Sequence, residues 1–238
     1  IICGAGIKNS QTDDEVILLS KKLNIPVVSS AGHGDVISFE YPLYSGQMGP
    51  RGNKIASSLV KNADLILAIG TRLGFNSTFY SYDNISQSAK IVQVDIDPIA
   101  IGRYFSVEVG IANDVKIFLD NLIYHIKDKD LKINNKNWTQ KFLKEKINYY
   151  KERDEKADVN SKLIQPSGLF RELRNLIPKN SSIILDAGTL CLQATDEFNF
   201  YESRSLFTPL DFGLVGFSFA CGLGVKLAKP NKTVVSLM

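Results

Sequence analysis

Residues 211–238 read DFGLVGFSFACGLGVKLAKPNKTVVSLM. The glycines of 213–216 predict a turn, and the small residues after them predict a helix over about 217–228. Pro230 ends that helix because proline lacks a backbone donor. The apolar, β-branched residues of 233–238 then predict a buried parallel strand. Because small residues let a neighbouring backbone or a ligand come close, the pattern fits both tight helix-on-sheet packing and a binding site.

The same stretch resembles the start of the diphosphate-binding domain of thiamine diphosphate-dependent enzymes in the acetolactate synthase-like family. In that family a glycine, any residue, an apolar residue and a second glycine precede a helix of small residues, a Pro-Asn or Pro-Asp turn and an apolar strand. The corresponding pieces here are Gly213-Leu214-Val215-Gly216, Lys229-Pro230-Asn231 and Thr233-Val234-Val235. The family strand leads into a Gly-Asp-Gly motif that helps to hold the metal ion and the diphosphate. Position 238 comes before any such motif, so the resemblance implies a fragment without metal ligands of its own.

Composition bounds the class of protein. The chain has 238 residues, which suffices for one large or two small domains. A hydrophobic content of 44% with 22% charged residues is ordinary for a globular protein. The net charge of +3 comes without a basic block, so nucleic acid is not an expected partner. No apolar run reaches about 18 residues, so no membrane span is expected.

Cysteines and histidines are too few to build the common metal or nucleophile sites. Cys3, Cys191 and Cys221 lie far apart without metal-ligand spacing, so they predict buried free thiols in a cytoplasmic protein. His33 and His125 are the only histidines, which makes a zinc site or a histidine triad hard to build. His33 lies between two glycines after a predicted strand. It fits either an exposed loop residue or a polar contact to substrate or to the neighbouring domain.

Residues 1–126 alternate predicted strands and helices, which is the pattern of a parallel α/β sheet. The strands are expected at 1–3, 25–29, 65–69, 91–94 and 107–111, and the helices at 12–23, 53–61 and 115–126. The first helix begins with a capping box of Thr12 and Glu15. Each strand ends in Gly, Asp or another small residue, at the edge where open α/β sheets bind ligands. Gly4-Ala5-Gly6 lacks the third glycine of a dinucleotide fingerprint, so it predicts a tight turn that needs its glycines for geometry.

Residues 127–163 predict an interdomain linker, with a mostly polar helix over 138–158. Residues 164–238 begin a second domain. There, a helix capped by Ser167 is expected to run to about 177, and a buried strand covers 182–185 before Asp186-Ala187-Gly188-Thr189. The expected fold class is α/β, with two parallel-sheet, Rossmann-like domains, the second of them truncated.

Residues 1–126 are similar in order and spacing to the central domain of the same enzymes. The matching pieces are Gly4-Ala5-Gly6, Ile25-Pro26-Val27, Gly32-His33-Gly34, Gly46 with Gly49 and Gly52, Ala63-Asp64-Leu65-Ile66-Leu67, Gly70-Thr71-Arg72-Leu73, Val94-Asp95-Ile96-Asp97-Pro98 and Asp114. In acetolactate synthases this domain often holds an FAD without a redox role. The resemblance would place the flavin near Gly49 and Arg72, and the adenine and ribose near Asp95.

The segment after Arg72 departs from the acetolactate synthase pattern. It reads Leu73-Gly74-Phe75-Asn76-Ser77-Thr78 where that group usually shows Phe-Asp-Asp-Arg, so FAD binding is left open. Two segments look closer to sulfoacetaldehyde acetyltransferases, namely Thr71-Arg72-Leu73 with Ser77-Thr78, and Ser106-Val107 with Val109-Gly110-Ile111.

The resemblance also implies where thiamine diphosphate, with Mg²⁺, would bind. The implied residues are Gly188, Thr189 and Leu190 at the diphosphate, and Gly213, Leu214 and Val215 at the rest of the cofactor. The Gly213 carbonyl would accept a hydrogen bond from the 4-amino group, and Val215 would lie under the thiazolium ring. For the Gly188 turn, a plain strand-end turn is the alternative.

The implied activity is that of a carboligase or lyase, which acts on a small 2-oxoacid or aldehyde donor through the C2 ylid of the cofactor. An acetolactate synthase would join two carbon units from pyruvate, whereas a sulfoacetaldehyde acetyltransferase would pass an acetyl group to phosphate. The activating glutamate would come from another domain, usually on another subunit. A homodimer or homotetramer is therefore expected, no catalytic residue is assigned within 1–238, and the isolated chain is expected to be inactive. A non-catalytic nucleotide-binding α/β module is the alternative.

Overall fold

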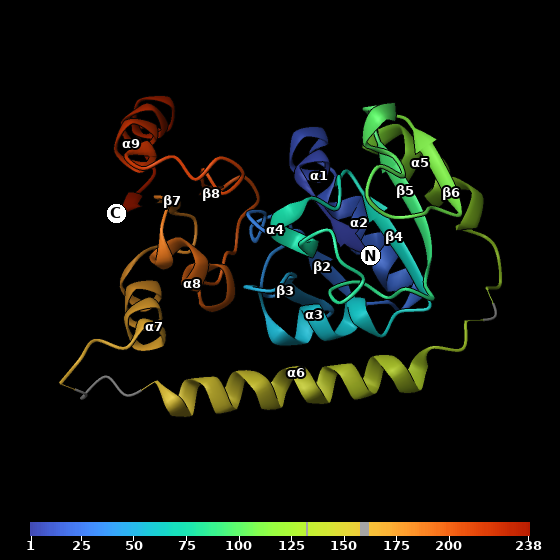
Figure 1. The fold of residues 1–238 in the computed structure, drawn as a ribbon, viewed down its shortest axis with the longest axis horizontal. Helices are drawn as coiled ribbons and strands as arrows, with labels where there is room; N and C mark the ends of the chain where they lie inside the picture. The colour runs from blue at the N-terminus through green and yellow to red at the C-terminus, as the bar shows by residue number, and fades with distance from the viewer. Residues whose placement is uncertain (132, 158–161) are drawn as a thin grey trace.

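A computed structural model describes residues 1–131, 133–157 and 162–238. Its larger part, the central unit, is built on a six-stranded parallel sheet with the order β3-β2-β1-β4-β5-β6 (Figure 1). The strands are β1 (Ile2–Cys3), β2 (Val27–Ser29), β3 (Tyr44–Gln47), β4 (Leu65–Ile69), β5 (Lys90–Asp95) and β6 (Val109–Ala112). The strand order reverses between β1 and β4, which places a crevice beyond their carboxyl ends. The predicted α/β class is confirmed.

Two apolar cores cover the two faces of this sheet. Helices α1 (Ala5–Ser10), α2 (Asp13–Leu23) and α5 (Val115–Ile126) close one face, and α3 (Lys54–Lys61) closes the other. Two short elements lie in the loops, α4 (Phe75–Thr78) and the 3-10 helix Pro98–Ala100. The long helix α6 (Lys136–Lys156) packs along α3 and reaches the second part of the chain (Figure 1).

The second unit carries a three-stranded parallel sheet with the order β8-β7-β9. Its elements are α7 (Pro166–Leu176), β7 (Ser182–Leu185), α8 (Thr189–Glu197), β8 (Leu206–Phe207), α9 (Phe217–Ala228) and β9 (Val234–Leu237). Phe170, Ile183 and Phe198 lie in its core. The prediction of a second parallel sheet is confirmed. Among the described residues, no helix combines the length and the apolar character needed to cross a membrane.

Local details differ from the sequence predictions. Thr12 precedes α2 but its side chain makes no capping hydrogen bond, so the capping box is wrong. Helix α7 begins at Pro166 after an uncapped Gln165, so Ser167 lies inside the helix. The predicted linker helix starts earlier, at Lys136, and its predicted last residue, Asp158, lies outside the described residues.

The Gly4-Ala5-Gly6 segment is not a free-standing tight turn, because it leads directly into α1. A Cβ atom on Gly4 would lie 2.2 Å from the Gly70 carbonyl oxygen, and one on Gly6 would lie 2.6 Å from the Gly70 Cα. The two glycines are therefore required by the close approach of α1 to the end of β4, and not by the backbone angles of a turn.

Candidate functional site

Asp186, at the end of β7, organises the glycine turn before α9. Its carboxylate accepts hydrogen bonds from the Ala187 N–H at 2.8 Å, the Gly216 N–H at 2.9 Å, and the Ser218 N–H and hydroxyl at 3.0 and 2.7 Å. The Ser218 side chain, followed by these amides, lowers the pKa of Asp186. An ionised Asp186 thus fixes the turn. Sequence reasoning missed this role, although an acid closing a buried strand was a signal for it.

The turn at Gly213 and the start of α8 form two walls of one cleft of about 320 Å³. Helix α8 begins at Thr189 after Gly188, which has no side chain to cap it, so within the described residues its first backbone N–H groups lack a side-chain cap. Gly188 has φ +130°, and no atom of the described residues lies within 4 Å of the position that a Cβ atom would take there. The free amides and the helix dipole favour an anion at this end of α8.

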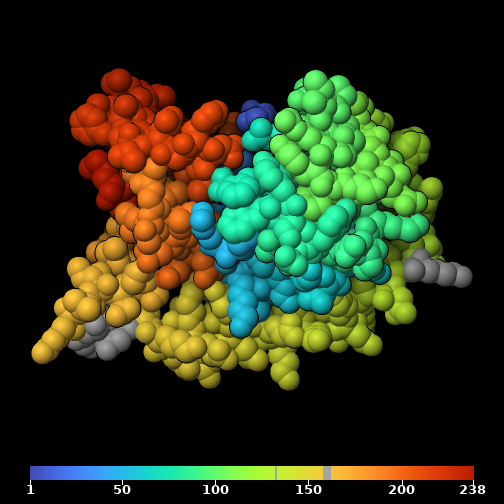
Figure 2. Space-filling model, viewed as in Figure 1, coloured from blue at the N-terminus to red at the C-terminus, as the bar shows by residue number. Residues whose placement is uncertain are grey.

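The structure brings three of the six predicted cofactor residues together in this cleft, namely Gly188, Thr189 and Gly213. Leu190 instead packs against the core of the second unit. Leu214 lines a neighbouring cleft of about 430 Å³ between the two units, and Val215 is 88% exposed. The neighbouring walls of the two units face each other in Figure 2, where residues near 200–215 are orange.

A third cleft, of about 410 Å³, lies at the carboxyl ends of β1, β4 and β5 and contains both Arg72 and Asp95. The Arg72 guanidinium forms an ion pair with Asp211 of the second unit at 3.0 Å. An Asp95 carboxylate oxygen accepts from the Asp97 N–H at 3.0 Å. Gly49 is not one of the residues that line this cleft. It packs against the α4 backbone, where an added Cβ atom would lie 2.7 Å from the Asn76 carbonyl oxygen.

His33 lines both the cleft that contains Arg72 and Asp95 and the cleft of about 430 Å³ between the two units. It is half-buried, which corrects the expectation of an exposed loop residue, and its Nδ1 is enclosed without a hydrogen-bond partner within the described part of the chain. Burial, and then the positive charges of Lys8 and Arg72, lower the pKa of His33 to about 3. The imidazole is therefore neutral at pH 7 and faces residues of the second unit.

Buried polar contacts hold the two units together, and we call this set the interunit joint. Asp35 accepts from the Ser205 and Leu206 N–H groups at 3.0 and 2.9 Å, and the Gln47 amide donates to the Thr195 carbonyl at 3.0 Å. Sequence reasoning did not find these residues.

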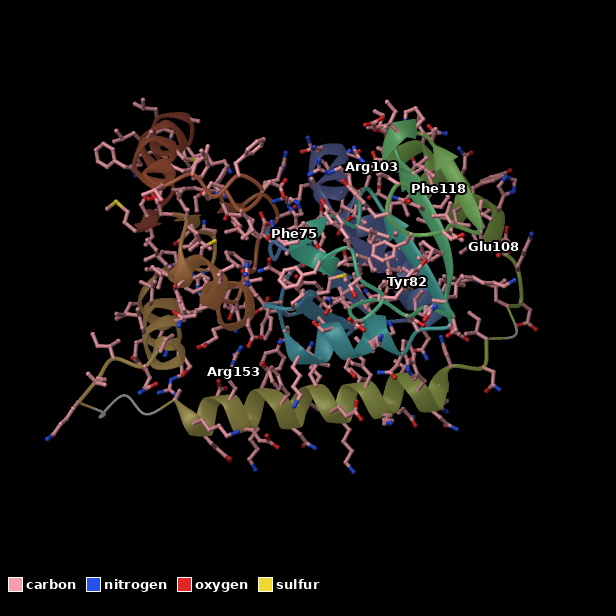
Figure 3. The ribbon with its side chains drawn as sticks, viewed as in Figure 1. Phe75, Tyr82, Arg103, Glu108, Phe118 and Arg153 are labelled. Carbon is pink, nitrogen blue, oxygen red and sulfur yellow. The ribbon has the colours of Figure 1, made fainter. Side chains whose placement is uncertain are left out.

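The joint continues at Asp196, near the end of α8. Its carboxylate accepts from the Asn53 amide at 3.0 Å and from the Tyr149 hydroxyl at 2.7 Å. Arg153, on the stretch of α6 nearest the second unit (Figure 3), donates to the Asp196 carbonyl at 3.3 Å. Burial raises the pKa of Asp196 above its ordinary value. The first residues of α8 thus line the cleft, and hydrogen bonds of the interunit joint hold its last turn.

Comparisons with known proteins agree with this architecture. Two family models match the chain: "Thiamine pyrophosphate enzyme, central domain" over residues 1–122, and "Thiamine pyrophosphate enzyme, C-terminal TPP binding domain" over residues 186–238. Sulfoacetaldehyde acetyltransferase of Castellaniella defragrans is 29% identical over 255 residues, which cover 99% of this chain and 43% of that protein. A probable acetolactate synthase large subunit of Methanococcus aeolicus is 30% identical over 246 residues, which cover 100% of this chain and 41% of that protein. The chain therefore spans about two fifths of the length of these relatives.

Proposed function

This chain belongs to the thiamine pyrophosphate enzyme family, and we propose that the protein that carries it is a thiamine diphosphate-dependent transferase or lyase. The observation that supports this most is the cleft between the uncapped start of α8 and the Gly213 turn. No carboxylate lines it among the described residues, so a diphosphate fits its charge. When bound, the cofactor supplies the carbon nucleophile, and the protein supplies orientation and electrostatics.

For the individual residues we propose the roles that the family resemblance implies. The backbone amides of Gly188, Thr189 and Leu190 bind the diphosphate, and the accompanying Mg²⁺ takes its ligands from outside these residues. The Gly213 carbonyl accepts from the cofactor's aminopyrimidine, and Leu214 and Val215 contact the thiazolium side. The exposure of Val215 supports this role, because the side chain is 88% exposed and lies two residues after Gly213, which lines the cleft. Asp186 positions the turn through Gly216 and Ser218.

For the substrate, we propose acetyl transfer from a small aldehyde such as sulfoacetaldehyde to phosphate, with acetolactate formation from pyruvate as the second candidate. The similarity to both kinds of relative supports the pair, and the segments around Thr71 and Ser106 favour the first. FAD is a further candidate ligand for the cleft that contains Arg72 and Asp95. A homodimer or homotetramer is the proposed assembly of the whole protein.

Calorimetric titration of the full-length protein with thiamine diphosphate and MgCl₂ tests the proposal. We expect saturable binding that weakens in Gly188→Ala, because a methyl group at φ +130° strains the turn and enters the cleft. Gly224→Ala is the matched control, since no described atom lies within 4 Å of its Cβ position and Gly224 does not line the cleft. Acetyl phosphate formation and acetolactate formation then distinguish the two substrates. A wild-type protein that binds no thiamine diphosphate would refute the proposal.

A further inference from the structure

The loop of residues 49–52 is a rigid support for Arg51. Gly49 has φ +128°, and a Cβ atom on Gly52 would lie 2.4 Å from the Gln47 carbonyl oxygen, so both positions require glycine. The Ser57 hydroxyl donates to the Gly49 carbonyl at 2.9 Å and accepts from the Gly49 N–H at 3.2 Å. The Gly52 N–H donates to the same carbonyl at 3.0 Å. The Arg51 backbone is therefore held in one place.

This support directs Arg51 toward the second unit. Arg51 belongs to the central unit, yet it lines the cleft formed by Gly188, Thr189 and Gly213. Its guanidinium carbon lies 5.4 Å from the centre of the Phe79 ring, and that stacking restricts the side chain. Arg51 and the uncapped start of α8 thus line the same cleft from different units.

The charge of Arg51 is not balanced by protein groups. Over the described ranges, Arg51 forms no ion pair, whereas the neighbouring Arg72 is paired with Asp211. The residues that line the cleft are Arg51, Asn76, Ala187, Gly188, Thr189, Cys191, Leu192, Pro209, Leu210 and Gly213, and these include no acid. A planar guanidinium with an open face is suited to bidentate contact with an oxyanion.

We propose that Arg51 is an oxyanion-binding residue of this cleft, contributed by the central unit. The inference rests on the proposed function, in which two oxyanions enter the cleft. One is the diphosphate of the cofactor, and the other is an anionic co-substrate, either phosphate or a 2-oxoacid carboxylate. Arg51 would bind the oxyanion across from the α8 amides, so the site is complete only when both units are in place.

The test compares Arg51→Met with Arg103→Met in the full-length protein. Arg103 is the matched control, because it is also exposed and also stacks on an aromatic ring. Its guanidinium carbon lies 5.3 Å from the centre of the Tyr104 ring, compared with 5.4 Å between Arg51 and Phe79. In Figure 3 it lies farther from the second unit than Phe75 does. Methionine keeps apolar packing on the ring and removes only the charge. Calorimetric titrations use three probes: thiamine diphosphate with MgCl₂, inorganic phosphate, and pyruvate.

We expect Arg51→Met to weaken binding of at least one probe about 10-fold to 150-fold, the range of a charge-assisted hydrogen bond, while Arg103→Met leaves all three unchanged. Loss confined to thiamine diphosphate identifies the diphosphate, and loss confined to phosphate or pyruvate identifies the co-substrate. Partial recovery in Arg51→Lys supports a charge contact, and equal melting temperatures exclude a folding defect. If the wild type binds thiamine diphosphate and Arg51→Met matches it for every probe, the inference is overturned and the proposed function stands. If the wild type binds none of the probes, both fail.

Discussion

Asp35 is the residue whose removal should damage the interunit joint most. Its side chain is 1% exposed and lies in the loop after β2. One carboxylate oxygen accepts from the Lys8 ammonium at 2.9 Å, and the other accepts from the N–H groups of Ser205 and Leu206 at the start of β8. Asp35→Ala would leave the ammonium and both amides without these partners, and the Lys8 side chain is itself only 13% exposed.

The expected loss of unfolding free energy is about 3–5 kcal/mol, the cost of removing one partner of a buried, hydrogen-bonded ion pair. The two amide contacts are included in this figure, since contacts in one network are not additive. For a cooperative unit the size of this chain, the loss corresponds to a drop of roughly 6–20 °C in the melting temperature of that unit. Asp35→Asn should lose less, because the amide keeps the shape and one acceptor oxygen.

Differential scanning calorimetry of the full-length protein measures the effect, and the chain offers a matched control. Glu108 (Figure 3) pairs with Lys90 at 3.5 Å, but the two side chains are 56% and 68% exposed. Glu108→Ala should therefore change stability by less than about 1 kcal/mol. If Asp35→Ala shifts the melting temperature no more than Glu108→Ala does, the claim that a buried carboxylate fastens β8 to the central unit is refuted.

Three further predictions concern titration and the cofactor turn. The pKa of His33 is about 3 in the folded state, below its ordinary value of 6.5. Between pH 6.5 and pH 3 the unfolded chain therefore binds one proton more than the folded chain. The free energy of unfolding falls as the pH drops through this range, by up to about 1.4 kcal/mol per pH unit. Urea unfolding at pH 7 and pH 5 measures this change in unfolding free energy, which should be smaller in His33→Gln than in the wild type. An equal change in both proteins would contradict the assignment. Burial raises the pKa of Asp196 above 3.8, so the folded state favours the protonated carboxyl. The contribution of this protonated form to the unfolding free energy is lost as the pH rises from 3.8 through the raised pKa. Asp196→Asn should therefore leave the unfolding free energy at pH 7 unchanged or raise it. Asp196→Ala should lower it by about 1–3 kcal/mol, because the Tyr149 hydroxyl loses its partner. Equal unfolding free energies of the two variants would count against this reasoning. Ser218→Ala should raise the pKa of Asp186, measured by carboxylate NMR, and weaken thiamine diphosphate binding, and an unchanged pKa would argue against the turn anchor.

The sequence predicted the elements whose local pattern is strong. Strand β4, helix α5 and helix α9 have the bounds that were expected. An apolar run specifies the first, a segment capped by Asp114 the second, and a helix of small residues between a glycine turn and Pro230 the third, without help from distant residues. Strands β3 and β8 were missed. The first is YSGQ, buried but without an apolar run, and the second is a two-residue strand that exists through its pairing with β7.

The site was predictable only where one unit builds it. Gly188 and Gly213 share a cleft because both follow strands of the same small sheet. Arg51 lines the same cleft, and His33 lines the cleft between the two units, because of how the two units pack. The hydrogen bonds between the loops of the central sheet and the second unit join residues 134 to 171 positions apart, from Asn76–Leu210 to Asp35–Leu206, and those from α6 to Asp196 join residues 43 and 47 positions apart. No periodicity within a segment encodes such pairs.

The polar character of the joint has a consequence for the cleft. An apolar interface would tolerate small slips between the units, since the hydrophobic effect is non-directional. Hydrogen bonds to buried groups such as Gln47 and Asp35 are directional, and a slip would leave each of them unpaired at a cost of about 1–3 kcal/mol. The walls of the cleft come from both units, with Arg51 on one side and Gly188 on the other. A cleft with walls from two units keeps its shape only if the orientation of the units relative to each other is specified. The directional hydrogen bonds of the interunit joint specify that orientation.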